Sequence, residues 1–259
     1  MTGVPGSPLS ALGLRLPVLA APMAGGPTTP ALVTAAAAAG SLGFLAAGYK
    51  APETLAVQMA EVRASRVAFG VNVFAPNPVP VDPGAYREYA LALQPEADRY
   101  GVDLRELGPQ EDDDHWRDKI DLLLAEPVAV VSFTFGIPAA GVVAALRKAG
   151  TVVLQTVTSA AEATRAIASG ADMLAVQGAA AGGHSGTLTP GHPPAAVPLA
   201  ELVAEIAGAV DRPLIAAGGL AEAGDVAAVL QAGADAAMVG TALLLADESG
   251  TSVAHRSAL

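Results

Sequence analysis

The segment with the strongest chemical content is residues 177–186, "QGAAAGGHSG". Its four glycines let the backbone lie close to a flat or charged ligand, and His184 stands at the end of that approach. Imidazole titrates near neutral pH, so His184 could transfer a proton or hydrogen-bond a substrate anion. A loop histidine that only packs is the alternative. We favour catalysis, because the segment directly follows an apolar run that reads as a strand.

Two further glycine-containing segments suit a phosphate group. Ala217-Gly218-Gly219 and Gly240-Thr241 each end an apolar run. Backbone N–H groups at such glycines approach a phosphate closely, and the Thr241 hydroxyl adds a donor near the start of a helix. Tight turns would use the same residues, and either a riboflavin phosphate or a sugar phosphate would fit. The two segments together favour a phosphate site.

Polar or rigid residues end three other apolar runs. Asn72 interrupts the run "FGVNVF" and Gln177 ends another. A buried amide must be hydrogen-bonded, either by backbone or by a ligand such as the edge of a flavin ring. Ala21, Pro22 and Met23 form a rigid turn that could lie against an isoalloxazine ring, although Met23 would serve equally well as core filler.

These residues need a scaffold, and the chain offers eight short apolar runs that alternate with alanine-rich helical stretches. The runs are Leu16–Met23, Leu42–Gly48, Val67–Phe74, Val128–Phe135, Val152–Val157, Met173–Val176, Pro213–Ala217 and Ala236–Val239. The helical stretches are Thr29–Ala39, Pro52–Ala64, Pro138–Ala149, Ser159–Ser169, Pro198–Val210 and Ala221–Ala232. Near-continuous apolar runs are typical of strands that are covered on both faces.

Glycines and an internal repeat support a regular strand–helix rhythm. Gly40, Gly150, Gly170 and Gly233 follow helical stretches, where glycine closes a helix in the left-handed conformation. The segments "GADMLAVQG" and "GADAAMVG" repeat one unit. We predict a (β/α)8 TIM barrel, with ligands at the carboxyl ends of the strands. A doubly wound open sheet is the rival, but no G-x-G-x-x-G follows the first strand.

One strand–helix unit is too long, and the last one is too short. Residues 76–127 begin with prolines and then become charged, which predicts a helical insertion after strand three that caps the barrel mouth. We take 1–259 as a single domain. Thr251–Leu259 barely begins an eighth helix, so the C-terminus reads as truncated. We therefore expect this chain either to be less stable than an extended one or to shield strands one and eight by self-association.

Composition excludes several classes of function. The net charge is −11 and the 14 Lys and Arg residues are scattered, which disfavours a nucleic-acid partner. No 20-residue apolar helix fits the uncharged stretch 16–49, because prolines and glycines interrupt it, so we expect no membrane span. There is no cysteine, and no His/Asp/Glu cluster has metal-ligand spacing, so we expect a metal-free cytoplasmic enzyme. A cofactor must then supply the difficult chemistry.

Taken in order, the motifs resemble those of the nitronate monooxygenase family, formerly called 2-nitropropane dioxygenases. They are "LPVLAAPMAGGPTTPALVTAAAAAG", "GFLAAGY", "FGVNVF", "SFTFG", "QGAAAGGHSG", "AAGGL" and "MVGTALL", and they cover nearly the whole chain. The resemblance implies non-covalent FMN and assigns the catalytic role to His184. It places the matching flavin positions at Met23, Asn72, Gln177, Gly182, Gly183, Gly218, Gly219, Gly240 and Thr241.

The reaction that the resemblance implies is oxidation of propionate 3-nitronate or an alkyl nitronate by O2, giving a carbonyl compound and nitrite. Two features depart from the family pattern. Ala180 stands where an acidic residue is frequent, and family members continue beyond this C-terminus. The alternatives are an FMN-dependent NAD(P)H reductase on the same scaffold, acting on enoyl-acyl-carrier-protein or quinone, a non-catalytic flavin-binding barrel, and a phosphosugar-processing barrel. "APMAGG", "AGY" around Tyr49 and "SFTFG" favour the monooxygenase.

Overall fold

The computed structural model describes residues 8–76 and 79–259. They divide into two units, of which the larger combines residues up to 75 with residues 114–259, and the smaller is 76–113. Each unit is described below by itself. Asn77 and Pro78, in the predicted insertion, lie outside the described residues.

The larger unit is built around eight parallel strands in the order β1-β8-β7-β6-β5-β4-β3-β2. The strands are β1 Val18–Ala20, β2 Phe44–Ala46, β3 Gly70–Phe74, β4 Val130–Thr134, β5 Val152–Val157, β6 Met173–Gln177, β7 Leu214–Ala217 and β8 Ala236–Val239. A single bridge, Ala20 to Gly43, joins β1 to β2 and nearly closes the ring. The predicted TIM barrel is therefore confirmed.

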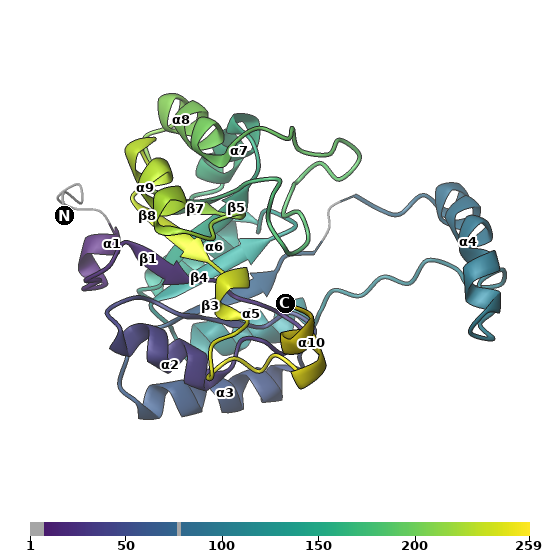
Figure 1. The fold of residues 1–259 in the computed structure, drawn as a ribbon, viewed down its shortest axis with the longest axis horizontal. Coiled ribbons are helices and arrows are strands. Elements are labelled where there is room, and N and C mark those ends of the chain that lie inside the picture. The colour runs from purple at the N-terminus through teal and green to yellow at the C-terminus, as the bar shows by residue number, and fades with distance from the viewer. Residues whose placement is uncertain (1–7, 77–78) are drawn as a thin grey trace. The chain divides into compact units, whose positions relative to one another are not determined.

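Helices surround these strands, with α2 and α3 on one side in Figure 1 and α7, α8 and α9 on the opposite side. The helices of this unit are α1 Pro8–Ala11, α2 Pro30–Ala38, α3 Pro52–Ala64, α5 Trp116–Ala125, α6 Ala140–Lys148, α7 Ala160–Ala168, α8 Leu199–Ala209, α9 Ala223–Gln231 and α10 Val253–Ala258, with a 3-10 helix at Thr241–Leu243. Among the described residues, none of the helices has both the length and the hydropathy required to cross a bilayer.

Local sequence sets where these helices begin and end. Thr29 caps α2 by accepting from the Leu32 backbone N–H at 3.0 Å, and Ser159 caps α7 in the same way. The backbone N–H groups of Ala221 and Glu222 bond to Asp225 at the start of α9 and lower the pKa of that carboxyl. Gly40, Gly150, Gly170 and Gly233 all have positive φ, between +87° and +111°, as predicted for helix ends.

The internal repeat has a structural meaning. Asp172 and Asp235 follow the two repeated Gly-Ala pairs, and each accepts from a backbone N–H at the start of a neighbouring strand. Asp172 Oδ2 lies 2.9 Å from Val153 N, and Asp235 Oδ2 lies 2.9 Å from Leu214 N. Each aspartate backbone N–H donates in turn to the carbonyl of that strand residue. The repeated motif thus holds β5 against β6 and β7 against β8.

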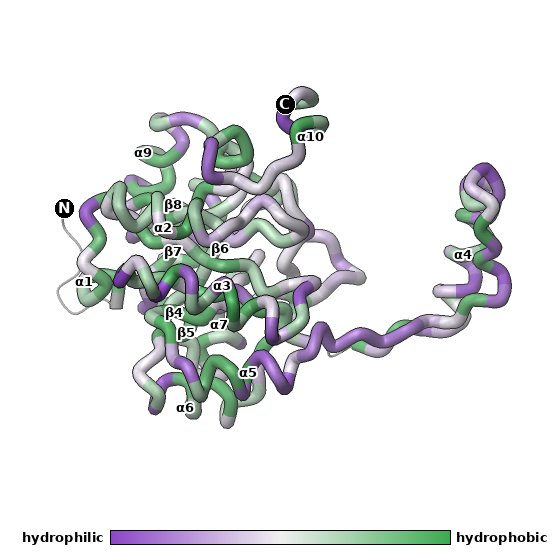
Figure 2. The backbone as a smooth tube through the Cα atoms, turned by 90° about the horizontal axis from the view of Figure 1, so that it is seen from below, coloured by the Kyte–Doolittle hydropathy of each residue, from purple (hydrophilic) through white to green (hydrophobic). Residues whose placement is uncertain are grey.

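Strand interiors form the core. A cluster that includes Leu19, Phe44, Leu154, Met173 and Ile215 fills the barrel, and Figure 2 shows the strands mainly in the hydrophobic colour. Two further clusters fill the space between strands and helices. β1 is only three residues long, and prolines, which have no N–H to donate to a sheet, stand directly before it at Pro17 and two residues after it at Pro22.

The smaller unit contains α4, Pro83–Asp98, capped by Asp82. The buried Gln94 side chain donates to Asp98 Oδ1 and Val102 O and accepts from Leu104 N, which ties the returning chain to the helix. This unit ends at Asp113, whereas the sequence predicted an insertion that continues to residue 127. The charged residues 116–125 form α5, which packs in the larger unit: Ile120 and Leu123 join its core, and the Trp116 ring lies 5.6 Å from Phe133.

Candidate active site

Most of the residues predicted for the site lie at or beyond the carboxyl ends of four strands, and Asn72 lies in the middle of a fifth. Ala21, Pro22 and Met23 follow β1, Asn72 is inside β3, Gln177 ends β6 and leads into Gly182–His184, Ala217 ends β7 before Gly218 and Gly219, and Gly240 and Thr241 follow β8. The carboxyl ends of parallel barrel strands share one end of the barrel. The structure therefore brings these segments to the same end.

The loop after β6 interlocks with those after β7 and β8. A Cβ atom built on Gly182 would lie 2.7 Å from Thr241 Oγ1, one on Gly218 would lie 2.9 Å from Ala181 Cβ, and one on Gly219 would lie 2.8 Å from Ala180 Cβ. Gly218 and Gly219 also have φ of +93° and +75°, which L side chains rarely adopt. Only glycine allows these loops to lie so close together.

This interlocked surface has the donors that a phosphate needs. Among the described residues, the backbone N–H groups of Gly219, Gly240 and Thr241 donate to no protein acceptor. Thr241 also begins the 3-10 helix, with its hydroxyl beside Gly182. Amide and hydroxyl donors in a glycine-lined turn fit a phosphate group.

Contacts within the turn after β1, and contacts with the chain after β8, hold that turn next to the interlocked glycine loops. Met23 N donates to Thr28 Oγ1 at 2.8 Å, and a Cβ atom on Gly240 would lie 3.7 Å from Met23 Sδ. Gly250 N donates to Pro27 O at 3.0 Å, which docks the chain after β8 on the same turn. Arg256, in α10, stabilises that docked chain by donating to the carbonyls of residues 245, 246, 249 and 251. Sequence reasoning did not single out Arg256.

The two amides predicted at the site make protein hydrogen bonds. The Asn72 amide nitrogen donates to Ser132 Oγ at 2.9 Å and Thr134 Oγ1 at 3.0 Å on the neighbouring strand. Gln177 donates to His184 O at 3.1 Å and accepts from Gly186 N at 2.5 Å. Gln177 therefore holds the backbone on both sides of Ser185.

His184 is exposed, and its ring contacts the first of three aromatic side chains that pack in a row. Its ring centroid lies 6.3 Å from that of Phe135, which lies 4.8 Å from Phe74, and Phe74 lies 5.3 Å from Tyr49. All three contacts are edge-to-face. These aromatic residues follow or end β2, β3 and β4. They extend the candidate site to three strands on which the sequence had predicted only one site residue, Asn72. Their position at strand ends, inside the quoted motifs, is the signal that could have identified them.

Backbone strain marks two of these aromatic residues. Tyr49 has φ of +62° and Phe135 has φ of +74°, which is uncommon for bulky side chains. Such strain persists only where the surroundings enforce it, and it gathers at functional sites. For Tyr49, the restraint is a hydrogen bond from its backbone N–H to Asp114 Oδ1 at 3.0 Å.

A buried ion pair supports that restraint. Lys119 is fully buried in α5, and its Nζ lies 2.8 Å from Asp114 Oδ2. Burial lowers the pKa of the neighbouring Lys50, and the positive charge of Lys119 lowers it further. The Lys50 ammonium donates to Gln58 Oε1 at 2.8 Å. Asp114 and Lys119 thus restrain the connection after β2. The sequence had predicted that both residues belong to the insertion.

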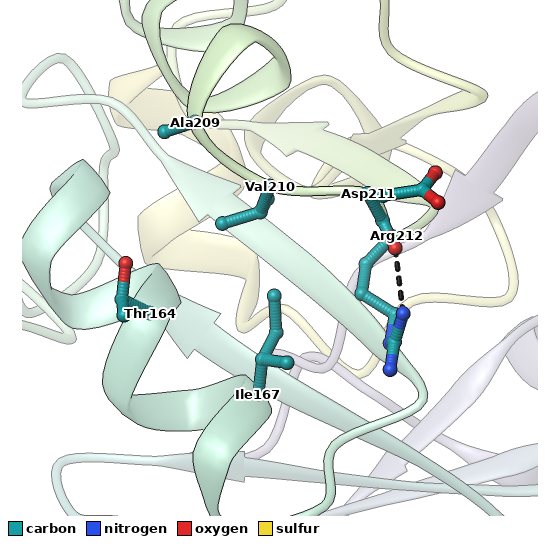
Figure 3. Close-up of a pocket in the computed structure, with 6 residues that line it drawn as sticks. All are labelled: Thr164, Ile167, Ala209, Val210, Asp211 and Arg212. Atoms are coloured by element: carbon teal, nitrogen blue, oxygen red, sulfur yellow. Dashed lines mark hydrogen bonds between the residues drawn. The ribbon is translucent and has the colours of Figure 1, made fainter.

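A cavity of about 240 Å³ lies elsewhere (Figure 3). It is lined by Thr164, Ile167, Ala209, Val210, Asp211 and Arg212. Residues 209–212 lead into the amino end of β7, so the cavity is at the end of the barrel opposite His184. Within the described part of the chain, no group of three His, Asp or Glu side chains is placed to hold a metal ion.

We expect Gly218→Ala to weaken FMN binding by roughly tenfold or more and to lower stability by about 1–2 kcal/mol. The added Cβ meets Ala181 and the Gly178 carbonyl oxygen at 3.0 Å or less, at a φ that alanine rarely adopts, so the interlocked loops must separate. Fluorescence titration of the flavin-free protein with FMN measures the loss. Gly191→Ala, in the connection between β6 and α8 with open space around its Cβ, is the control. Equal affinity in the two variants would contradict the expectation.

Comparison with known proteins adds to this geometry. Residues 7–259 match the family described as nitronate monooxygenase. A nitronate monooxygenase of Pseudomonas aeruginosa is 36% identical over 253 residues, 96% of this chain and 71% of the relative. A probable nitronate monooxygenase of Bacillus subtilis is 35% identical over 94% of this chain and 70% of its own. A nitroalkane oxidase structure from Streptomyces ansochromogenes has a TM-score of 0.86 and 45% identity, covering 97% of this chain and 72% of that one.

Proposed function

Since the chain belongs to the nitronate monooxygenase family of oxidoreductases, we propose that it binds FMN and uses O2 to oxidise alkyl nitronates, such as propionate 3-nitronate, to a carbonyl compound and nitrite. The observation that carries the proposal is the position of His184. It is an exposed imidazole on the loop after β6, whose glycines interlock with the turns after β7 and β8. A proton-transferring group thus stands next to a surface that fits a flavin phosphate.

The cofactor proposal rests on three backbone N–H donors and on the residues that would line the flavin ring. The N–H groups of Gly219, Gly240 and Thr241 would bind the single phosphate of FMN. Met23 and the turn 21–23 would lie against the ring, and Asn72 and Gln177 would meet its polar edge. When bound, the flavin would supply the acceptor for the substrate's electrons and the group that reacts with O2.

The chain's own residues would bind and orient the substrate. A nitronate carries negative charge on its oxygens, so the His184 ring N–H would donate a hydrogen bond to it. If a neutral nitroalkane binds instead, the same ring nitrogen, when unprotonated, would accept its α-proton. Phe135 and Phe74 would exclude water from the carbon side of the substrate, because Phe135 adjoins His184 and Phe74 packs against Phe135.

The purified chain should therefore be yellow and active. We expect a flavin absorbance spectrum, a heat-released ligand that elutes with FMN, and oxygen uptake with nitrite formation when propionate 3-nitronate or an alkyl nitronate is added. FAD in the released ligand, or a colourless protein that FMN does not bind, would contradict the cofactor proposal. Bound FMN without oxygen uptake on either nitronate would contradict the proposed reaction.

Anaerobic mixing with NADH or NADPH separates the alternatives on the same scaffold. A monooxygenase that takes electrons from nitronate should keep its flavin colour, whereas a flavin-dependent reductase should bleach it quickly. Bound FMN that responds to neither nitronate nor reduced nicotinamide would indicate a non-catalytic flavin-binding barrel.

A further inference from the structure

A buried carboxylate outside the predicted site contacts the loop that carries His184. Glu162 is in the first turn of α7 and is 3% exposed. Its Oε2 accepts from Thr158 N at 2.6 Å and from Thr158 Oγ1 at 2.9 Å, which stabilises the start of its own helix. Its Oε1 accepts from Leu188 N at 2.6 Å and from Thr187 Oγ1 at 2.9 Å, residues more than twenty positions further along the chain.

These contacts demand a carboxylate. Each oxygen accepts one backbone N–H and one hydroxyl, so all four donors point at acceptors. A hydroxyl can rotate and accept a bond, but a backbone N–H cannot. A glutamine amide in this position would direct its NH2 group at the backbone N–H of either Thr158 or Leu188, and one side of the contact would be lost.

The bonds to Glu162 begin three residues after His184. Before that point in the chain, the Gln177 side chain donates to His184 O and accepts from Gly186 N. Gly186 itself is buried, and a Cβ atom there would lie 2.8 Å from Thr156 Cγ2 at the end of β5. The backbone from 184 to 188 is therefore fixed by two side chains, Gln177 from β6 and Glu162 from α7.

We propose that Glu162 is a positioning residue for His184: by binding Thr187 and Leu188 it sets where the loop leaves the barrel mouth and hence where the imidazole stands. The inference rests on the proposed function for the role of His184 in turnover. The four hydrogen bonds of the Glu162 carboxylate go to Thr158, Thr187 and Leu188 and to none of the interlocked residues 180–182, 218–219 and 241, so we expect its action to be confined to the histidine side of the site.

The first test is Glu162→Gln in the FMN-loaded chain. We expect kcat/KM for a nitronate to fall by about 10- to 100-fold, the usual effect of misplacing a catalytic group by about an ångström, with FMN affinity unchanged. In a His184→Ala background the same substitution should cause no further loss, because the group that Glu162 positions is gone. Equal losses in both backgrounds would overturn the proposal, since they would indicate a general structural effect.

A readout independent of activity is hydrogen–deuterium exchange. Glu162→Gln should raise exchange at residues 184–190, and Glu205→Gln, an exposed glutamate on α8, should leave it unchanged. Should the wild-type chain turn over no nitronate, the proposed function fails, but exchange still decides whether Glu162 holds this loop. Unchanged exchange would overturn the proposal in either case.

Thr187→Val covers the case in which Glu162→Gln does not fold. Valine has nearly the same shape as threonine and removes one donor to Oε1, so we expect the same non-additive loss at smaller size. Thr187→Ser, which restores the hydroxyl, should recover most of the activity. If Thr187→Val has the same kcat/KM as Thr187→Ser, the contact between residue 187 and the carboxylate plays no role in turnover and the proposal is contradicted.

Discussion

His184→Ala is expected to lower kcat/KM for a nitronate by roughly 100- to 10,000-fold, the range typical of general acid–base groups, while FMN stays bound. The loss should be large because the imidazole is exposed next to the aromatic side chains, where the substrate would lie. FMN should be retained because the proposed phosphate donors belong to the turns after β7 and β8. Steady-state oxygen uptake and flavin absorbance measure the two effects separately.

His192→Ala is the matched control, because His192 belongs to the same long connection between β6 and α8 but lies outside the loop held by Gln177 and Glu162. It should retain normal turnover. If His184→Ala keeps near-normal kcat/KM, the catalytic assignment is wrong. If it instead loses FMN, the imidazole supports the cofactor and not the substrate.

Asp114→Asn is expected to lower the free energy of unfolding by about 3–5 kcal/mol, the usual result of removing one partner of a buried ion pair. Asparagine retains an oxygen for the Tyr49 N–H and tolerates the left-handed backbone at this position, where φ is +53°. What it removes is the negative charge 2.8 Å from the fully buried Lys119 ammonium. Urea unfolding followed by circular dichroism measures the change.

The double variant Asp114→Asn with Lys119→Met should recover most of that stability, because no uncompensated charge then remains buried. Asp121→Asn, on the helix α5 that carries Lys119, is the control. Its pair with Arg117 is 3.9 Å long and mostly exposed, so its loss should not shift the unfolding midpoint measurably. A double variant as unstable as Asp114→Asn alone would show that the charge of Lys119 is not the source of the loss.

Features that depend on neighbours in the chain were predictable from sequence. The helix-ending glycines are one example, since Gly40 or Gly233 satisfies a backbone requirement within its own turn. The strand runs are another, because burial on both faces leaves an apolar stretch that is visible without the fold. The barrel, and the placing of the candidate site residues at one end of it, follow from these two patterns.

Features that depend on distant partners were not predictable. Lys119 is charged, and its surroundings in sequence are charged, so the segment read as an exposed insertion, yet it is fully buried against Asp114. Glu162 resembles an ordinary first-turn acid until Thr187 and Leu188 are placed beside it. The positive φ of Phe135 has no sequence signal, because a bulky residue adopts it only when surrounding contacts enforce it.

The interlocked glycine turns restrict how this surface can change. Ala180, Ala181 and Gly182 fit against Gly219, Gly218 and Thr241, and none of the three glycines has room for an added methyl group. A larger residue on one side therefore requires a smaller residue or a shifted backbone on the other, so the three turns should change together as a coupled set. A designer who wants this barrel to accept a bulkier phosphate ester would have to redesign two turns at once, since single substitutions would separate the turns before they enlarge the binding surface.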